Sequence, residues 1–145
     1  METAEFFRGV DIFKHLSENQ LERLAGLAVE LAFPEGPILQ DNDEGGGLYV
    51  MKSGMVKVTK KAADTAGVEA VLAILHPGNS FGEISLIDGL PRSANVVAMG
   101  PTVCYFLPRD AFMLALRENL EIALAMLPAL ASMVRSSDQW VAQLI

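Results

Sequence analysis

Between residues 33 and 108 the chain alternates short apolar runs with turn-forming residues, and this alternation constrains the fold more than any other feature. The segment Phe33-Pro34-Glu35-Gly36-Pro37 cannot continue a helix, because proline lacks the backbone N–H that a helix needs. Short strands separated by turns at this spacing predict a sandwich or barrel. The apolar runs are Ile38–Gln40, Leu48–Met51, Met55–Thr59, Val68–Leu75, Asn95–Met99 and Val103–Leu107.

Helical periodicity precedes this region. Ser17 and Gln20 match a capping box, and leucines at helical spacing predict a helix from Glu18 to Leu31. We expect these leucines to pack against the core of the same chain. The expected N-terminal helices cover about residues 1–32 and the β region covers 33–108.

Helical periodicity also returns after Pro108. Arg109 begins one expected helix and Asn119 caps another, while Pro128 is expected to break or kink the pattern or to lie in the first turn of a final helix. The C-terminal helices are thus expected over 109–145. At this length we expect one domain, residues 1–145, that is mainly β with flanking helices.

A heptad pattern runs along the expected C-terminal helix. It predicts packing either on a second copy in a homodimer or on the chain's own barrel. Ser137 is its polar member, and a hydroxyl buried there without a partner would cost about 1–3 kcal/mol. The hydroxyl can bond a carbonyl one turn back or meet a ligand. The members are Met126, Leu130, Met133, Ser137, Trp140 and Leu144.

The stretch Pro77–Ala94 carries the strongest chemical signal. Gly82 lets the backbone turn and lets a ligand approach closely, since it has no Cβ. Residues from Glu83 to Ile87 can form about one helical turn, whose first N–H groups suit an anion. Arg92 adds a planar fork of donors that matches phosphate. A carboxylate at Glu83, beside an anion site, makes sense if it accepts from sugar hydroxyls, so the pattern indicates a nucleotide.

Two segments of this stretch resemble the phosphate-binding cassette of the cyclic nucleotide-binding domain family. They are Phe81-Gly82-Glu83-Ile84-Ser85-Leu86 and Pro91-Arg92-Ser93-Ala94, within the cassette region 81–94. The family includes catabolite activator proteins, regulatory subunits of cyclic-AMP-dependent kinase and cyclic-nucleotide-gated channels. The similarity extends from about Phe13 to Ser137. It implies a double-stranded β-helix (jelly-roll) barrel with helices at both ends, and N-terminal helices that move against the barrel when ligand binds.

The resemblance also implies roles for individual residues. Backbone N–H groups of Ile84 and Ser85, together with the Arg92 guanidinium, would hold the cyclic phosphate. Glu83 would accept from the ribose 2′-hydroxyl, and Ser93 would donate to the phosphate or the purine. The full set of expected ligand-binding residues is Gly82, Glu83, Ile84, Ser85, Arg92, Ser93, Ala94, Val58, Val71, Ala73 and Ser137.

The base that is read follows from Ser93 and Ser137. Serine after the arginine accompanies cyclic AMP in the catabolite activator proteins, but a serine hydroxyl can also accept from the guanine 2-amino group. Laid on those proteins, Ser137 falls at the position whose hydroxyl meets the purine. A second hydroxyl can accept from the 6-amino group that only adenine has. Cyclic AMP is therefore expected over cyclic GMP as the ligand.

Composition excludes several other functions. A net charge of −7 argues against direct binding to nucleic acid or to anionic membranes. The histidines are far apart, so we expect no metal, and no nucleophile motif supports an enzyme. Cys104 lies in an apolar run and is expected to be buried and inert. Without an apolar span or leader, we expect a cytoplasmic protein.

Two alternative functions accompany this interpretation. The transcription-factor branch of the family continues into a helix-turn-helix domain. The chain can therefore be the ligand-sensing fragment of a longer regulator, as well as a stand-alone sensor. A cupin-like metalloenzyme shares the barrel but needs clustered histidine or carboxylate ligands.

Overall fold

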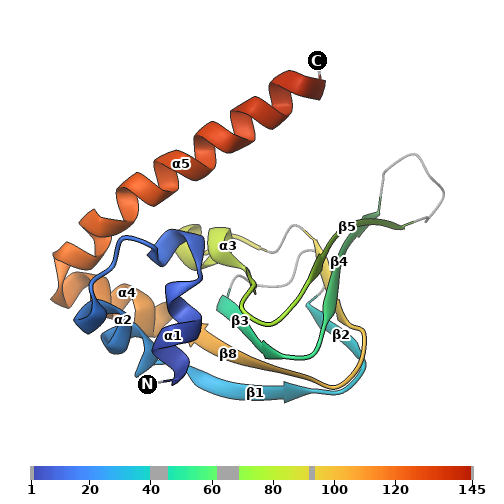
Figure 1. The fold of residues 1–145 in the computed structure, drawn as a ribbon, viewed down its shortest axis with the longest axis horizontal. Helices are drawn as coiled ribbons and strands as arrows, with labels where there is room; N and C mark the ends of the chain where they lie inside the picture. The colour runs from blue at the N-terminus through green and yellow to red at the C-terminus, as the bar shows by residue number, and fades with distance from the viewer. Residues whose placement is uncertain (1, 40–45, 62–68, 92–93, 145) are drawn as a thin grey trace.

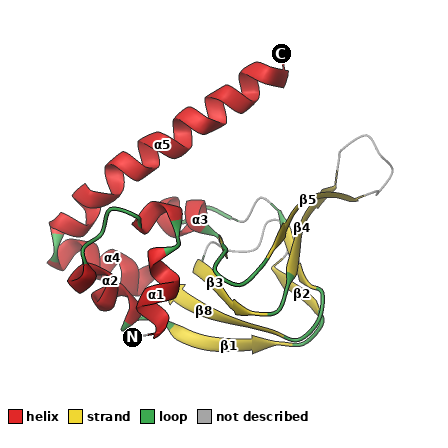
Figure 2. Ribbon diagram, viewed as in Figure 1, coloured by secondary structure: helices red, strands yellow, loops and turns green. Residues whose placement is uncertain are grey.

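Two antiparallel four-stranded sheets form the body of the protein, with helices at one end (Figures 1 and 2). The computed structural model describes residues 2–39, 46–61, 69–91 and 94–144 of the 145-residue chain, and the side chains of 61, 69 and 137–144 lie outside that description. The expectation of a mainly β fold with flanking helices is confirmed.

Each sheet combines strands that are far apart in the sequence. The first sheet has the order β1-β8-β3-β6, with β1 Val29–Phe33, β8 Thr102–Pro108, β3 Gly47–Ser53 and β6 Ser80–Phe81. The second has the order β2-β7-β4-β5, with β2 Gly36–Leu39, β7 Asn95–Ala98, β4 Val56–Lys61 and β5 Glu69–Leu75. Every pairing is antiparallel.

The helices pack around one end of the sheets (Figure 1). The N-terminal ones are α1 Glu2–Arg8, the short 3-10 helix Asp11–Phe13 and α2 Glu18–Ala25. The helix α3 Glu83–Asp88 follows β6, and α4 Arg109–Glu118 and α5 Leu120–Leu144 end the chain. The predicted capping box holds, since Gln20 N–H donates to Ser17 Oγ at 3.2 Å and Ser17 N–H donates to Gln20 Oε1 at 2.9 Å.

The buried core has two parts. One lies between the helices and the first sheet, where Phe7, Phe13 and Phe112 are among the fully buried side chains. The other lies between the sheets and includes Met51, Val56 and Cys104. The expected burial of Cys104 is confirmed, since its side chain is fully buried and burial raises the pKa of its thiol to about 11.

The prediction that one helix runs from Glu18 to Leu31 is wrong at its C-terminal end. The helix ends at Ala25, Gly26 caps it, and β1 begins at Val29. Each β1 residue then pairs with β8, from Val29 opposite Phe106 to Phe33 opposite Thr102. Pairing along a whole strand thus overrides the leucine spacing that suggested a longer helix.

Pro128 neither breaks nor starts a helix. It lies inside α5, so the expected break and the expected first-turn position are wrong, while the expected kink stays a prediction. A proline removes the hydrogen bond to the carbonyl four residues earlier, here that of Leu124. Both Pro128 and Leu124 are on the exposed side of α5, so water can satisfy that carbonyl.

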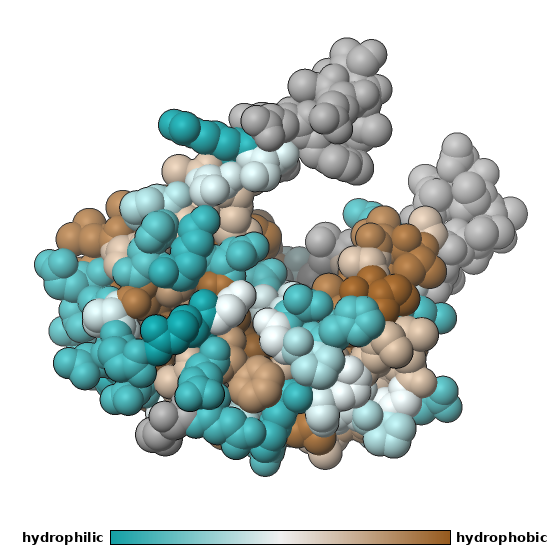
Figure 3. Space-filling view, viewed as in Figure 1, coloured by the Kyte–Doolittle hydropathy of each residue, from teal (hydrophilic) through white to brown (hydrophobic). Residues whose placement is uncertain are grey.

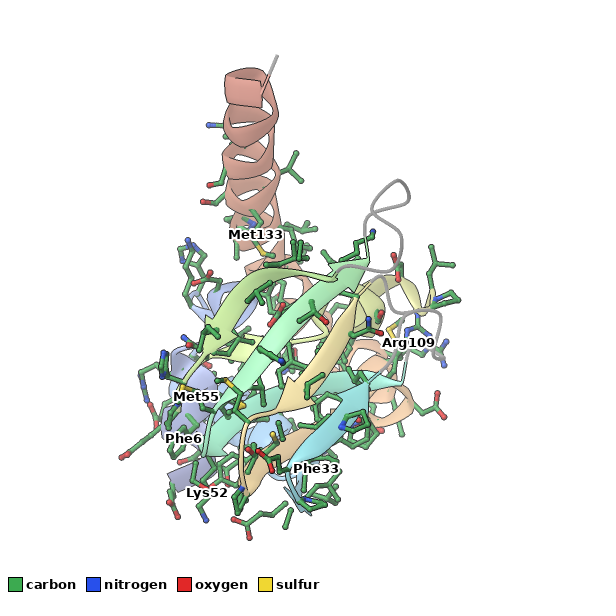
Figure 4. All side chains as sticks on the ribbon, turned by 90° about the vertical axis from the view of Figure 1, so that its right-hand side faces the viewer. Phe6, Phe33, Lys52, Met55, Arg109 and Met133 are labelled. Atoms are coloured by element: carbon green, nitrogen blue, oxygen red, sulfur yellow. The ribbon has the colours of Figure 1, made fainter. Side chains whose placement is uncertain are left out.

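The heptad pattern packs on the chain's own core along its first half. Met126 is buried, and Leu130 and Met133 pack against the same core as Phe112. Met133 lies where α5 leaves the body of the molecule (Figure 4). The side chains of Ser137, Trp140 and Leu144 are outside the described ones.

Candidate functional site

A cavity of about 300 Å³ opens between the second sheet and the segment that begins at β6. One side is formed by apolar side chains from four different strands of the second sheet, and the other by the residues around the start of α3. The lining residues are Leu39, Val58, Leu75, Ser80, Phe81, Gly82, Glu83, Ile84, Ser85, Ala94 and Val96.

The backbone at the start of α3 has the conformation that glycine permits. Gly82 has φ 93° and ψ 14°, in the left-handed region that residues with a Cβ rarely adopt. Its carbonyl accepts from Leu86 N–H at 3.0 Å, which closes the first turn of α3. The helical turn expected from Glu83 to Ile87 is therefore present, and its first N–H groups have no partner within the helix.

The strand β6 fixes the entry to that turn. Phe81 stacks on Tyr49 of β3 with ring centroids 4.9 Å apart and an interplanar angle of 6°. Ahead of it, Met51 N–H donates to Asn79 O at 2.8 Å and Gly78 N–H donates to Met51 O at 2.9 Å. Residues 78–81 are thus tied to β3 by backbone bonds and by a buried ring.

The Glu83 carboxylate already has one hydrogen-bond donor within the protein. Ser80 Oγ donates to Glu83 Oε1 at 2.5 Å. Glu83 is half-buried and lies between the cavity described above and a second cavity of about 250 Å³. The second cavity is also lined by Asp11, Asn79 and Met133. An oriented carboxylate with a free oxygen at the cavity wall can accept from a ligand hydroxyl.

Ile84 and Ser85 contribute in different ways. Ile84 lines the cavity with a side chain that is 61% exposed, so it stands at the mouth. Ser85 is buried, and its hydroxyl donates to Leu90 O at 3.0 Å. Because that hydroxyl is used within the protein, the backbone N–H is the group that Ser85 offers to an anion.

The C-terminal end of α3 is held by α4. Gly89, with φ 71°, ends α3, and its N–H donates to Ser85 O at 2.9 Å. Arg109, the first residue of α4, donates from Nη2 to Ile87 O at 3.2 Å. Figure 4 shows Arg109 beside the second sheet. A cation at the C-terminal end of a helix is stabilising.

The expected site residues are brought together only in part. Gly82, Glu83, Ile84, Ser85, Ala94 and Val58 line one cavity. Val71 and Ala73 on β5 are exposed and do not line it, and apolar residues gather on the surface around β5 (Figure 3). Arg92 and Ser93 lie outside the described residues, and so does the side chain of Ser137, although its backbone belongs to α5.

Sequence reasoning missed most of the apolar wall, apart from Val58, and one polar neighbour. Leu39, Leu75 and Val96 lie in apolar runs that were assigned to strands, but nothing in the runs says which side faces a ligand. Ser80 lies in the stretch that carries the strongest chemical signal, three residues before Glu83, and that spacing was the available clue.

The described residues offer neither a metal cluster nor a membrane-spanning helix. Among the described residues no group of three histidine, cysteine, aspartate or glutamate side chains is arranged to hold a metal ion. Within the same residues no helix is both long and apolar enough to cross a membrane.

Two sheets, a glycine turn, a carboxylate and an apolar wall define a small-molecule binding domain. A family model described as "Cyclic nucleotide-binding domain" matches residues 33–119, which is more than half of the chain. The chain belongs to the cyclic nucleotide-binding domain family.

The individual relatives include a protein kinase and a cyclic AMP receptor protein. The cGMP-dependent protein kinase isozyme 1 of Drosophila melanogaster is 34% identical over 76% of this chain and 15% of that protein. The cyclic AMP receptor protein of Thermus thermophilus is 31% identical over 90% of this chain and 60% of that protein. The chain therefore spans less than two thirds of the length of each.

The fold agrees with a solved relative. The N-terminal domain of a transcriptional regulator from Streptomyces coelicolor superposes with a TM-score of 0.79 at 29% identity, covering 89% of this chain and 91% of that one.

Proposed function

We propose that this chain is a regulatory sensor that binds cyclic AMP in preference to cyclic GMP and transmits binding through its flanking helices. The observation that carries the proposal is the cavity of about 300 Å³ in which the start of α3 and Glu83 face apolar strand residues. Polar groups on one wall and an apolar opposite wall suit a ligand with a charged sugar phosphate at one end and a flat base at the other.

The phosphate and ribose are held by the cassette. Backbone N–H groups of Ile84 and Ser85 and the Arg92 guanidinium hold the cyclic phosphate, and Gly82 allows its close approach. Glu83 accepts from the ribose 2′-hydroxyl, and Ser93 donates to the phosphate or the purine. What supports these roles is the position of Gly82, Glu83, Ile84 and Ser85 along one cavity wall, with Ala94 nearby.

The base lies against the strands. Val58 of β4 supplies apolar surface in the cavity, together with Leu75 and Val96. Val71 and Ala73 stay proposed base contacts, and this role requires β5 to approach the ligand, since both side chains are exposed and lie outside the cavity lining. Cyclic AMP is favoured because hydroxyls at Ser93 and Ser137 suit the adenine 6-amino group. The relatives do not distinguish between the two ligands, because one is named for cyclic GMP and another for cyclic AMP.

The chain binds its ligand and does not transform it, and it acts in the cytoplasm without contacting nucleic acid or membrane. We infer that the two sheets form a jelly-roll barrel and that residues 1–145 act as one domain, either alone or as the sensing part of a longer transcription regulator. The match to 60% of the Thermus thermophilus protein supports the second context.

A homodimer through α5 completes the proposal. The exposed side of α5 carries large apolar side chains at heptad spacing, separate from the buried Met126 side. These side chains are Leu120, Leu124, Leu127 and Val134, with exposures of 68%, 55%, 57% and 60%.

Calorimetric titration with cyclic AMP tests the ligand. The wild type should bind, and Arg92→Ala should bind about tenfold more weakly or worse while staying folded, because a charge-assisted contact to the phosphate in a partly dry pocket is worth about 2–5 kcal/mol. Arg117→Ala, an exposed arginine on α4, is the matched control and should bind as the wild type does. Equal affinity of Arg92→Ala and the wild type would remove the cassette assignment.

Competition between cyclic AMP and cyclic GMP tests the base. The wild type should favour cyclic AMP, and Ser137→Ala should reduce that preference. A wild-type preference for cyclic GMP, or a ratio that Ser137→Ala leaves unchanged, would show that α5 does not read the purine.

Amide hydrogen exchange of α4 and α5 with and without ligand tests the proposed helix movement, which unchanged protection would contradict.

A further inference from the structure

Ser80 lies beside the Glu83 carboxylate at the wall shared by the two neighbouring cavities. Its Oγ donates to Glu83 Oε1 at 2.5 Å, and both residues line both cavities. We propose that Ser80 is a positioning residue that holds the Glu83 carboxylate for the ligand's 2′-hydroxyl and so sets the discrimination between ribose and 2′-deoxyribose. This inference rests on the proposed function.

Ser80 is a rigid donor. It belongs to β6, where it pairs with Val50 of β3, and its neighbour Phe81 is stacked on Tyr49. The turn before it is closed by Asn79, whose Oδ1 accepts from His76 N–H at 2.8 Å. The position of the hydroxyl is therefore set by the sheet.

Glu83, in contrast, has a long side chain with several rotatable bonds. Half-buried between two cavities, its carboxylate can lie toward the cavity of Gly82 and Ile84 or toward the cavity of Asp11. Fixing a rotamer-rich side chain in one arrangement before ligand arrives removes an entropic cost of binding. The bond from Ser80 selects one arrangement at no cost when the ligand binds.

The bond supports the ligand contact and does not compete with it. An ionised carboxylate has two oxygens with about four acceptor positions, and Ser80 uses one of them at Oε1. The other oxygen stays available to a hydroxyl donor. Loss of Ser80 should therefore weaken the contact to the 2′-hydroxyl. If Ser80 instead competed with the ligand for the carboxylate, its loss would strengthen that contact.

The experiment is calorimetric titration with cyclic AMP and 2′-deoxy cyclic AMP. Ser80→Ala should lose about three- to tenfold in affinity for cyclic AMP and clearly less for the deoxy analogue, as expected for freeing one side chain. Ser80→Cys, which keeps the size but donates weakly, should shift the ratio of the two affinities in the same direction. Ser80→Thr, which keeps the hydroxyl donor, should have the wild-type ratio. Ser53→Ala, at the exposed end of β3 and outside both cavities, is the matched control.

A double-mutant cycle separates positioning through Glu83 from a general effect on folding. In the Glu83→Ala background, Ser80→Ala should no longer change the ratio of the two affinities. An unchanged ratio of the two affinities in Ser80→Ala would overturn the inference while leaving the proposed function intact. So would a change in that ratio that is equally large in the Glu83→Ala background. Absence of wild-type binding to either nucleotide would instead remove the proposed function itself.

Discussion

Replacing Gly89 by alanine should destabilise the end of α3 through two separable causes. Gly89 has φ 71° and ψ 7°, so an alanine there adopts a left-handed conformation, which costs about 1–2 kcal/mol. A Cβ at this position would also lie 2.9 Å from Arg109 Cζ and 3.0 Å from Arg109 Nε. The guanidinium must therefore move.

The second cause breaks the contact between α4 and α3. If Arg109 moves, its bond from Nη2 to Ile87 O at 3.2 Å is lost, which at a partly exposed position is worth about 1 kcal/mol. We expect Gly89→Ala to lower the free energy of unfolding by about 2–3 kcal/mol in total.

Gly78→Ala provides the matched control. Gly78 has φ 94°, so it carries a similar backbone cost, but no atom lies within 4 Å of a Cβ built there. Urea unfolding followed by circular dichroism should show Gly89→Ala about 1 kcal/mol less stable than Gly78→Ala. In an Arg109→Ala background the two glycine variants should become equivalent. Equal stabilities in the wild-type background would refute the argument that Arg109 holds this end of α3.

Two further predictions concern the thiol and α5. Burial raises the pKa of Cys104 to about 11, so its reactive thiolate is scarce until the pH approaches that value. The thiol should therefore resist a maleimide at pH near 8 in the folded protein and react once urea unfolds it. Rapid labelling of the folded protein would contradict this. Leu124→Glu should shift the chain toward monomer in sedimentation velocity, while Leu114→Glu on α4, similarly exposed at 53% against 55%, should not. A monomeric wild type would remove the proposed homodimer.

The sequence predicted those parts of the fold that depend on local patterns. The capping box at Ser17, the helical turn after Gly82 and the strands after Pro37 all follow from the chemistry of a few neighbouring residues. The strand β1 could not be predicted in this way, because its segment also fits a helical leucine pattern and its strand state comes from pairing with β8. The strand β6 has only two residues, and it exists because β3 offers a partner.

In the candidate site, too, the residues that are neighbours in sequence could be predicted and those brought together by the fold could not. Gly82, Glu83, Ile84 and Ser85 are neighbours in sequence, so their joint position on one wall could be predicted. Leu39, Leu75 and Val96 meet only because three strands of one sheet face the same cavity. The bond between Ser80 and Glu83 depends on side-chain geometry at the junction of β6 and α3, which spacing alone does not determine.

The two ends of α3 are attached to different parts of the molecule, which is the arrangement that the proposed movement of the flanking helices requires. The N-terminal end follows β6, which belongs to the first sheet, whereas the C-terminal end is bonded to Arg109 of α4.

An apolar cavity of about 180 Å³ lies beside α3, between Ile87 and residues of α4 and α5 such as Phe112 and Met126. Such a space leaves room for the packing of α3, α4 and α5 to change. A ligand can shift an equilibrium only by binding one state better, and a phosphate held on the first N–H groups of α3 would favour the position of α3 that brings those groups closest to it. Because Arg109 ties the other end of α3 to α4, we expect α4 and α5 to follow.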